Sequence, residues 1–203
     1  MPKLYFKYGV MGSSKTAQAL MYRFNYEQQG FEVTLLKPSL DTRDVDKDGN
    51  IVCRSRVGLE AKCVVFDKEE NLYKLIFGLT QFRDRSVVIV DESQFLTTEQ
   101  VNQLKEVSAH IPVNCYGLLT NFKTELFEGS KRLVETADVL QEIKFICECG
   151  NRANVNARFI DGKITVNGEE ILIGKEDYYK PLCYNCFLKS LRESGEASPY
   201  AQD

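Results

Sequence analysis

The chain has 203 residues and a net charge of −3, from 26 lysines and arginines against 29 aspartates and glutamates. This balance excludes the basic surface that a nonspecific nucleic-acid-binding protein needs, and a hydrophobic content of 43% excludes a disordered chain. No apolar run approaches the roughly 20 residues of a membrane helix, and the first ten residues lack the apolar region of a signal peptide. We therefore expect a soluble, cytoplasmic protein with no nucleic-acid or membrane partner.

The N-terminal segment predicts a strand, a turn, a helix and a second strand. Residues 3–8 are short and rich in aromatic side chains, and Gly9 follows them, as is typical of a strand that ends in a turn. Apolar residues recur at helical spacing over 16–29, before Gly30, and residues 31–37 have the composition of a further strand. The segment is therefore a predicted βαβ unit.

The middle of the chain continues this alternation. The polar stretch 41–56 has few apolar anchors, and we expect a mobile loop there. Further along, the sequence predicts a helix over 69–79, a buried strand over 86–90, a helix over 97–110 and a strand over 112–119. Strands that alternate with helices predict a mostly parallel α/β sheet, which we assign to residues 1–142.

A second, small β-rich unit is predicted over 143–192. Residues 153–160 and 163–167 have the pattern of short strands, joined at Asp161-Gly162, which is a hairpin signal. The remaining residues, 193–203, have the composition of a disordered tail. The length of the chain agrees with one domain and a small appendage.

The loop between the first strand and the first helix resembles a phosphate-binding loop. The pattern G-x-x-x-x-G-K-[ST] is matched except at Ser14, which stands in place of the second glycine. In such a loop the backbone N–H groups face phosphates, the lysine meets the β- and γ-phosphates, and the threonine binds Mg²⁺. An ordinary turn between strand and helix is the alternative. The candidate residues are Gly9, Val10, Met11, Gly12, Ser13, Ser14, Lys15 and Thr16.

Ser14 decides whether this loop is intact. A serine has a backbone N–H to donate, as glycine has, and is at a disadvantage only where φ is positive. Residues just before a helix commonly have negative φ, so we expect Ser14 to be unstrained.

A buried strand that ends in two acids is the second motif. In "SVVIVDESQF" the strand 86–90 leads directly into Asp91 and Glu92. The arrangement is typical of P-loop enzymes, in which the first acid holds Mg²⁺, and the second could take a proton from a hydroxyl. The alternative is a solvated Asp-Glu pair at the start of a loop. Because both motifs occur in the right order, we expect a nucleoside triphosphate site.

Cysteines supply the third motif. An odd total of seven argues against a disulfide framework. Four of them come as C-x-C and C-x₂-C pairs, and four thiolates suit tetrahedral zinc. Four free buried cysteines are the alternative. The predicted zinc ligands are Cys147, Cys149, Cys183 and Cys186.

Two other features are weaker. The stretch "DVDKDGN" starts like a calcium loop, but Ser55 occupies the place of its final glutamate, so we expect no calcium site. His110 is near no nucleophile motif, and we interpret it as a helix-end residue.

Together these motifs resemble the zinc-containing (type II) thymidine kinases, over nearly the whole chain. The segments that carry the resemblance are "GVMGSSKT", "DTR" (41–43), "SRVG" (55–58), "DESQF", "YGLLTNFKTELFEGS", "CECG" and "ILIGKEDYYKPLCYNC". The resemblance implies a P-loop core, a small zinc domain with a lasso loop that closes over the nucleoside, and a cytoplasmic homotetramer. It also implies ATP, Mg²⁺ and structural Zn²⁺, thymidine or deoxyuridine as substrate, and dTTP as a feedback ligand.

The resemblance further implies roles for individual residues. Glu92 matches the family's proton acceptor, Arg43 matches an arginine near the phosphates, and Gln94 is grouped with the ATP and Mg²⁺ residues Lys15, Thr16 and Asp91. The residues that match the nucleoside pocket are Met11, Phe95, Phe122, Phe127, Leu172, Ile173, Gly174 and Tyr179.

This chain departs from the family pattern at three positions. Besides Ser14, it has Leu119 and Asn121 where bacterial members often have arginine and aspartate. Because both charges are absent together, no unpaired ion is left buried. Three alternatives remain open from sequence: a P-loop kinase or ATPase for another substrate, a zinc-dependent nucleic-acid-binding module, and an enzyme relic.

Overall fold

The computed structural model describes residues 2–41, 44–168 and 179–196, and its largest element is a six-stranded parallel sheet. Each strand pair in this sheet is parallel, in the order β5-β2-β6-β7-β1-β8. The predicted, mostly parallel α/β sheet is therefore confirmed. The strands are β1 (Leu4–Tyr8), β2 (Glu32–Pro38), β5 (Val64–Phe66), β6 (Ser86–Val90), β7 (Val113–Gly117) and β8 (Val139–Glu142).

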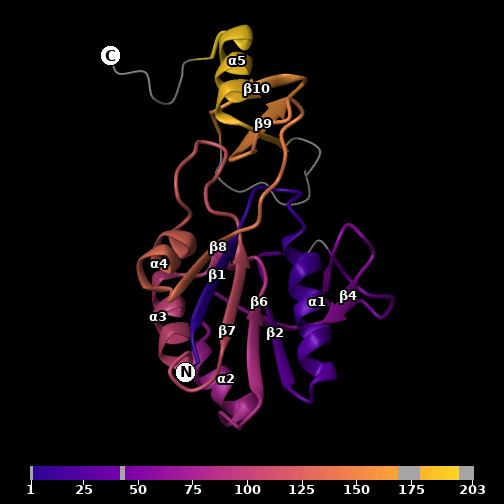
Figure 1. Ribbon diagram of the computed structural model, residues 1–203, viewed down its shortest axis with the longest axis vertical. Helices are drawn as coiled ribbons and strands as arrows, with labels where there is room; N and C mark the ends of the chain where they lie inside the picture. Colours follow the sequence, from indigo (N-terminus) through magenta and orange to yellow (C-terminus); the bar gives the residue numbers. More distant parts are fainter. Residues whose placement is uncertain (1, 42–43, 169–178, 197–203) are drawn as a thin grey trace.

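Helices cover both faces of the sheet (Figure 1). Alternate residues of a strand point to opposite faces, and the buried clusters follow this rule. Leu36 and Val88 pack with α2 (Leu72–Thr80), α3 (Thr98–Val107) and α4 (Glu128–Thr136). Leu35 and Ile89 pack on the other face with α1 (Lys15–Gln28). The sheet is thus buried on both sides, as the β-branched run of β6 predicts.

A short stretch of the polar segment 41–56 forms a strand, which the sequence did not predict. β3 (Val52–Arg54) pairs antiparallel with β4 (Glu60–Lys62). The expectation of a loop was wrong here because Val52 and Cys53 are buried against the rest of the protein, so this hairpin has its own apolar anchors.

The small unit contains a three-stranded antiparallel sheet and a helix. Its sheet has the order β10-β9-β11, from β9 (Val155–Ile160), β10 (Lys163–Thr165) and β11 (Tyr179–Leu182). The turn between β9 and β10 is the predicted Asp161-Gly162 hairpin, and both residues have positive φ. Helix α5 (Tyr184–Ser194) follows β11 and reaches two residues into the stretch 193–203 that the sequence assigns to a tail. Residues 197–203 lie outside the described part of the chain.

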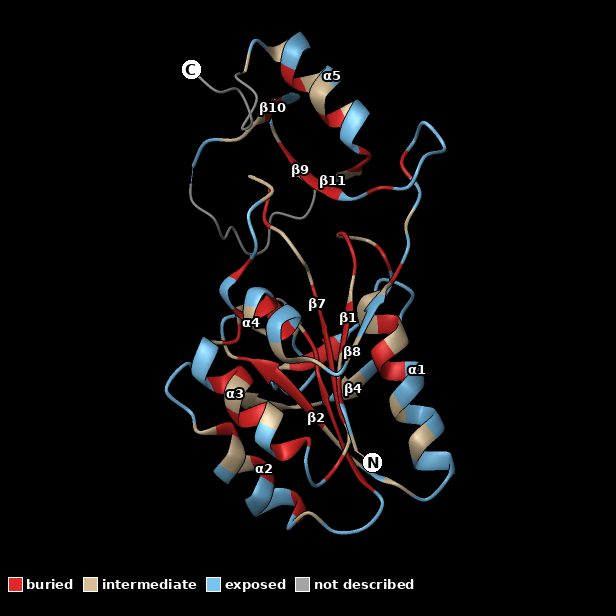
Figure 2. Cartoon of the chain, turned by 60° about the vertical axis from the view of Figure 1, so that its left-hand side comes forward, coloured by how far each residue is buried: buried red, intermediate tan, exposed pale blue. Residues whose placement is uncertain are grey.

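The small unit lies beyond the carboxyl ends of the parallel strands. Figure 1 shows β9, β10 and α5 beyond the end of the sheet toward which β1 and β7 run, and Figure 2 shows the buried strands of the sheet enclosed by helices whose outer faces are exposed. In open α/β sheets, ligands bind at this carboxyl edge. The arrangement therefore places the candidate motifs between the two parts of the chain.

None of the helices in the described ranges combines the length and apolar character needed to span a membrane.

A buried lysine lies on the face of the sheet that α1 covers. Lys7 in β1 is 3% exposed, its Nζ donates to the Tyr116 hydroxyl at 3.0 Å, and it lies 3.4 Å from the centre of the Tyr22 ring. Burial lowers the pKa of Lys7 from 10.5 to about 8. The neutral amine is therefore favoured in the folded chain more than in the unfolded chain.

This lowered pKa predicts a pH dependence of stability. Between the two pKa values the unfolded chain binds a proton that the folded chain has lost, so the free energy of unfolding should increase with pH in this window. In denaturant titrations of wild type and Lys7→Met, the stability of wild type relative to the variant should increase from about pH 7 to about pH 10. A difference that stays constant over this range would contradict the lowered pKa.

Candidate active site

The phosphate-binding motif forms a tight loop between β1 and α1. The Gly9 N–H donates to the Gly117 carbonyl at 3.3 Å, and α1 begins at Lys15. A side chain at Gly9 would collide with its surroundings, because a Cβ there would lie 2.4 Å from Ser13 Oγ and 2.7 Å from the Ile143 carbonyl oxygen. The loop therefore wraps closely around the N-terminus of α1, where N–H groups and the helix dipole favour an anion.

Lys15 points back over this loop. Its Nζ donates to the carbonyl oxygens of Val10 at 2.8 Å and Gly9 at 3.2 Å. The ammonium group of Lys15 therefore lies close to the N-terminus of α1, where a phosphate would bind. The structure thus places a cation beside the loop.

Ser14 does not have the negative φ that the sequence analysis expected. Its φ is 63° and its ψ is 25°, in the left-handed region. The expectation was wrong because the residue at the N-cap of α1 reverses the chain direction between loop and helix. Glycine adopts this conformation freely, whereas a residue with a Cβ is strained there by about 1–2 kcal/mol.

Asp91 joins the second motif to the first. It follows β6, is 3% exposed, and its side chain is hydrogen-bonded to the side chain of Thr16 at the start of α1. Burial, followed by the charge of Glu92, raises the pKa of Asp91 to about 7. A hydroxyl and a carboxylate in contact are hard oxygen ligands of the kind Mg²⁺ prefers, so the residues present fit that ion.

Glu92 is held in a fixed orientation beside Asp91. Its backbone is left-handed, with φ of 52°, and Gln94 Nε2 donates to Glu92 Oε2 at 2.6 Å. Gln94 Oε1 in turn accepts the Leu118 N–H at 3.0 Å. A strained backbone at a non-glycine residue is a feature of functional sites. Here it turns the Glu92 carboxylate away from the sheet and toward a cavity.

The cavity has a volume of about 780 Å³ and lies between the sheet and the small unit. It collects most of the predicted site residues, although they come from distant parts of the sequence. Gly9, Val10 and Ser13 support the loop from behind and are not among its lining residues. The predicted residues that line it are Met11, Gly12, Ser14, Lys15, Thr16, Asp91, Glu92, Gln94, Phe95, Phe122, Phe127 and Tyr179.

One end of the cavity is apolar. The rings of Phe95 and Phe127 meet edge to face with centroids 6.0 Å apart, and Phe122 is buried with the guanidinium of Arg158 3.6 Å from its ring centre. Aromatic walls suit a flat, ring-shaped group, and the charged end opposite them suits phosphate groups.

Four of the predicted residues fall outside the described part of the chain. They are Arg43, Leu172, Ile173 and Gly174. The roles that the resemblance implies for these four residues stay predictions.

The sequence analysis missed a group of charged residues at the cavity. Lys37 and Asp41 form an ion pair at 3.3 Å, and both side chains are 2% exposed. Burial lowers the pKa of Lys37, but the combined effect of its neighbours, of which Asp41 contributes most, raises that pKa above its ordinary value. Lys37 is the last residue of a predicted strand, a position that indicates only a place in the core. The sequence therefore does not indicate that Lys37 lies at the cavity. The other missed lining residues include Asp44, Arg54, Arg56 and Asn156.

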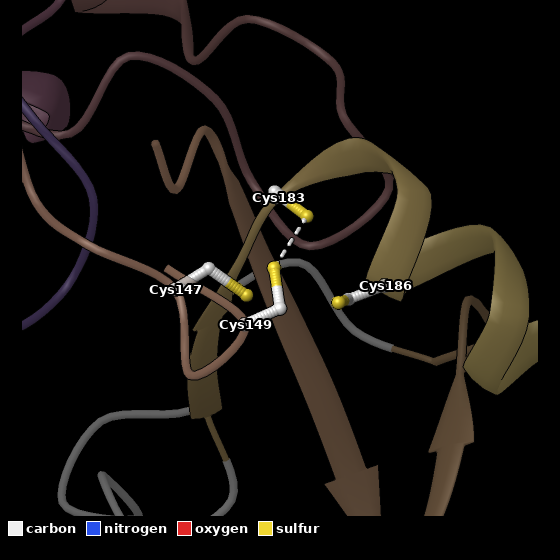
Figure 3. A group of neighbouring side chains, drawn as sticks. All are labelled: Cys147, Cys149, Cys183 and Cys186. Atoms are coloured by element: carbon white, nitrogen blue, oxygen red, sulfur yellow. Dashed lines mark hydrogen bonds between the residues drawn. The ribbon is translucent and has the colours of Figure 1, made fainter. Parts of the chain in front are cut away.

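The four predicted zinc ligands converge at one point. Their sulfur atoms all lie within 4.8 Å of one another, and Cys149 Sγ and Cys183 Sγ are 3.5 Å apart. Figure 3 shows Cys147 and Cys149 on a loop, with Cys183 and Cys186 at the start of α5, all directed inward. Four thiolates each about 2.3 Å from a tetrahedral zinc would have this spacing, so the donor set fits zinc.

Asp46 and His110, from the two weaker features of the sequence, both contact neighbouring residues. Among the described residues the four cysteines are the only group of three or more His, Cys, Asp or Glu side chains whose donor atoms converge closely enough to hold a metal ion. The Asp46 carboxylate accepts the N–H groups of Asp48 and Asn50 within its own turn. His110 stacks on the Phe82 ring with centroids 4.6 Å apart, just after α3 ends.

Comparison with known proteins decides the family. The family model described as thymidine kinase matches residues 2–187. The chain belongs to the thymidine kinase family. It is therefore an ATP-dependent thymidine kinase, a phosphotransferase, and the resemblance seen in the sequence is confirmed. The alternatives of another kinase, a nucleic-acid-binding module and a relic are set aside in favour of this activity.

Curated relatives are similar over nearly their full length. The thymidine kinase of Vibrio vulnificus (strain CMCP6) is 41% identical over 94% of this chain and 99% of its own. That of Legionella pneumophila (strain Lens) is 42% identical over 98% and 94%, and that of Rhodopirellula baltica is 38% identical over 97% and 92%. A solved structure, the Legionella pneumophila ATPase DotB, aligns over 74% of this chain and 43% of that chain, with 16% identity and a TM-score of 0.36.

The left-handed conformation of Ser14 predicts that this thymidine kinase is stabilised by Ser14→Gly. Release of the backbone strain should add about 1 kcal/mol to the free energy of unfolding and raise Tm by about 2–4 °C. Ser14→Ala, which keeps a Cβ, is the matched control and should give no such increase. Thermal unfolding without ligands measures both, and an unchanged or lower Tm for Ser14→Gly would contradict a strained loop.

The cysteine cluster predicts about one tightly bound zinc ion per chain. Elemental analysis of the purified protein should find it, and Cys183→Ser should lose zinc on dialysis against a chelator. Cys63→Ser is the control, because Cys63 is half-buried outside the cluster, with its sulfur near the Ile51 carbonyl. Full activity in a protein free of zinc would refute a structural metal.

Proposed function

We propose that the cavity of about 780 Å³ is where this thymidine kinase aligns its two substrates, with the ATP phosphates at the loop 9–16 and the nucleoside against the aromatic wall. The observation that carries the proposal is the convergence of Lys15, Thr16 and Glu92 with Phe95 and the other aromatic residues on one cavity. The cavity is of the size that binding sites for small molecules usually have. Alignment of two substrates in one site removes much of the entropic barrier to their reaction.

Magnesium binding is assigned to Thr16 and Asp91. When bound with ATP, Mg²⁺ offsets negative charge on the phosphates. The hydrogen bond between the two side chains supports this assignment, because it brings the oxygens of both motifs to one place. A divalent cation there would also favour the ionised form of the buried Asp91 carboxyl, whose pKa is otherwise raised.

Glu92 is assigned the role of general base. Its carboxylate accepts the proton of the nucleoside 5′-hydroxyl while that oxygen bonds to the γ-phosphorus of ATP. The bond from the γ-phosphorus to the β,γ-bridging oxygen breaks, and ADP leaves with that electron pair. Gln94 supports the assignment because it fixes the Glu92 carboxylate at 2.6 Å. Lys15 supplies positive charge for the transferring group.

The nucleoside wall is assigned to Met11, Phe95, Phe122 and Phe127, with Tyr179 at the start of β11. A wall of this kind accepts a hydrogen or a methyl group at C5, so we propose that deoxyuridine is a substrate as well as thymidine. Selection against deoxycytidine is assigned to backbone carbonyls around Leu172 to Gly174, because cytosine lacks the N3–H that a carbonyl accepts. Release of ADP with each deoxynucleoside tests this, and equal turnover of deoxycytidine would refute it.

We propose a homotetramer, feedback inhibition by dTTP, and a cytoplasmic protein that binds no nucleic acid. Exposed apolar side chains on α1, including Met21 and Phe24 at 56% and 59%, support burial against another subunit. The net charge of −3 supports the absence of nucleic acid. Analytical ultracentrifugation tests the tetramer, and a monomer at micromolar concentration would contradict it.

The role of Glu92 predicts a large kinetic defect in Glu92→Gln. Glutamine has nearly the same shape and can still accept from Gln94, but it cannot take the proton, so kcat should decrease by roughly 10²–10⁴. ATP affinity and Tm should change little. Steady-state kinetics measure this.

Glu106→Gln is the matched control for that variant. It makes the same chemical change at an exposed position of α3, and its kcat should equal that of wild type. A Glu92→Gln enzyme within a few-fold of this control would move the base elsewhere.

A further inference from the structure

The central strand of the small unit presents two different faces. In β9, Val155 and Ala157 point into the core of the small unit, where they pack with Phe187 of α5. The alternate residues, Asn156 and Arg158, are polar but only 3% and 1% exposed. Because side chains of a strand alternate, these two residues point the other way. They point toward the cavity, where Asn156 is a lining residue and Arg158 covers the Phe122 ring.

The side-chain amide of Asn156 joins two loops at the carboxyl edge of the six-stranded sheet. Its Oδ1 accepts the backbone N–H of Met11 at 2.8 Å, and its Nδ2 donates to the backbone carbonyl of Thr120 at 2.9 Å. An amide can make this pair of contacts in one orientation only, because one partner is a donor and the other an acceptor. Since the amide is buried, loss of the side chain would leave a backbone donor and a backbone acceptor unpaired.

The phosphate loop is therefore held from both ends. Its second half continues into α1, which begins at Lys15. Its first half is held by the small unit, since Val10 is part of that unit's core, with Cys147 and Val155, and the Met11 N–H is taken by Asn156. The Met11 N–H is thereby directed at a side chain of the small unit. The small unit, which carries the four cysteines, thus sets the shape of the loop and also covers the cavity.

We infer that Asn156 is a positioning residue: it fixes the phosphate loop through the Met11 amide and couples metal binding at the four cysteines to ATP binding. The inference rests on the proposed assignment of residues 9–16 to the ATP phosphates. Coupling between two sites is reciprocal, so ATP bound at the loop must also favour the metal-bound form of the small unit.

Two measurements on Asn156→Ala test this inference. In calorimetric titration of the zinc-loaded protein with a nonhydrolysable ATP analogue and Mg²⁺, the variant should bind roughly ten- to a hundredfold more weakly, as loss of a buried hydrogen-bond pair predicts. In wild type, saturating analogue should also slow the transfer of zinc to a coloured chelator. In Asn156→Ala, analogue at a concentration that saturates the weakened site should no longer slow it. A purely structural role would lower Tm and leave the effect of the analogue on zinc release intact.

Three further variants make the result decisive. Asn154→Ala is the matched control, since Asn154 lies two residues earlier and is exposed, and it should behave as wild type. If Asn156→Ala does not fold, Asn156→Leu replaces it. Leucine has nearly the same shape but no acceptor for the Met11 N–H, so the analogue should no longer protect zinc in this variant either. Lys15→Ala tests the loop itself: undiminished binding of the analogue by Lys15→Ala would refute the proposed phosphate site.

Wild-type affinity in Asn156→Ala together with wild-type protection of zinc would overturn the inference about Asn156. If Lys15→Ala has lost affinity in the same experiment, the proposed phosphate site is unaffected by that outcome.

Discussion

The contact between Asp91 and Thr16 is the interaction on which the site depends, because it brings together the loop after β1 and the loop after β6. These strands are not neighbours: β7 lies between them in the sheet. The contact is possible because β7 ends in Gly117, which leaves room for both loops. The Gly9 N–H reaches the Gly117 carbonyl from one side. On the other side, a Cβ on Gly117 would lie 2.6 Å from Ser93 Oγ and 2.9 Å from Gln94 Oε1.

From this contact the rest of the site follows in order. Asp91 is buried and makes a hydrogen bond with Thr16, so Glu92, the next residue, must turn into the cavity, and its left-handed backbone is the cost of that turn. Gln94 then holds the Glu92 carboxylate and the Leu118 amide together. The small unit closes the other side, with Asn156 between Met11 and Thr120. One cavity is thus built from strand ends of the large sheet and one strand of the small unit.

Much of this was predictable from sequence, because the signals were local. The glycine-rich turn between a strand and a helix, the buried strand that ends in Asp91-Glu92, and the paired cysteines each have a pattern with a physical cause. The structure brings their side chains together as that reasoning expects. The capping box of α3, between Thr97 and Gln100, is a local signal of the same kind.

The features that sequence did not reveal depend on tertiary packing. The φ of Ser14 is set by how the loop meets α1, and the local sequence "GSSKT" does not predict it. β3 is a strand because Val52 and Cys53 are covered by other elements. Lys37 and Asn156 occupy ordinary strand positions, and their importance comes from partners that are distant in sequence, as in the contact of Asn156 with Met11. Local patterns do not encode such partners.

A crystal structure with thymidine, a nonhydrolysable ATP analogue and Mg²⁺ tests the central claim most directly. The account predicts that the triphosphate lies on the loop 9–16 with Lys15 at its terminal phosphates, and that the 5′-hydroxyl is about 2.6–3.2 Å from the Glu92 carboxylate. A nucleoside whose 5′-hydroxyl points away from Glu92, or a triphosphate bound outside the loop, would contradict it.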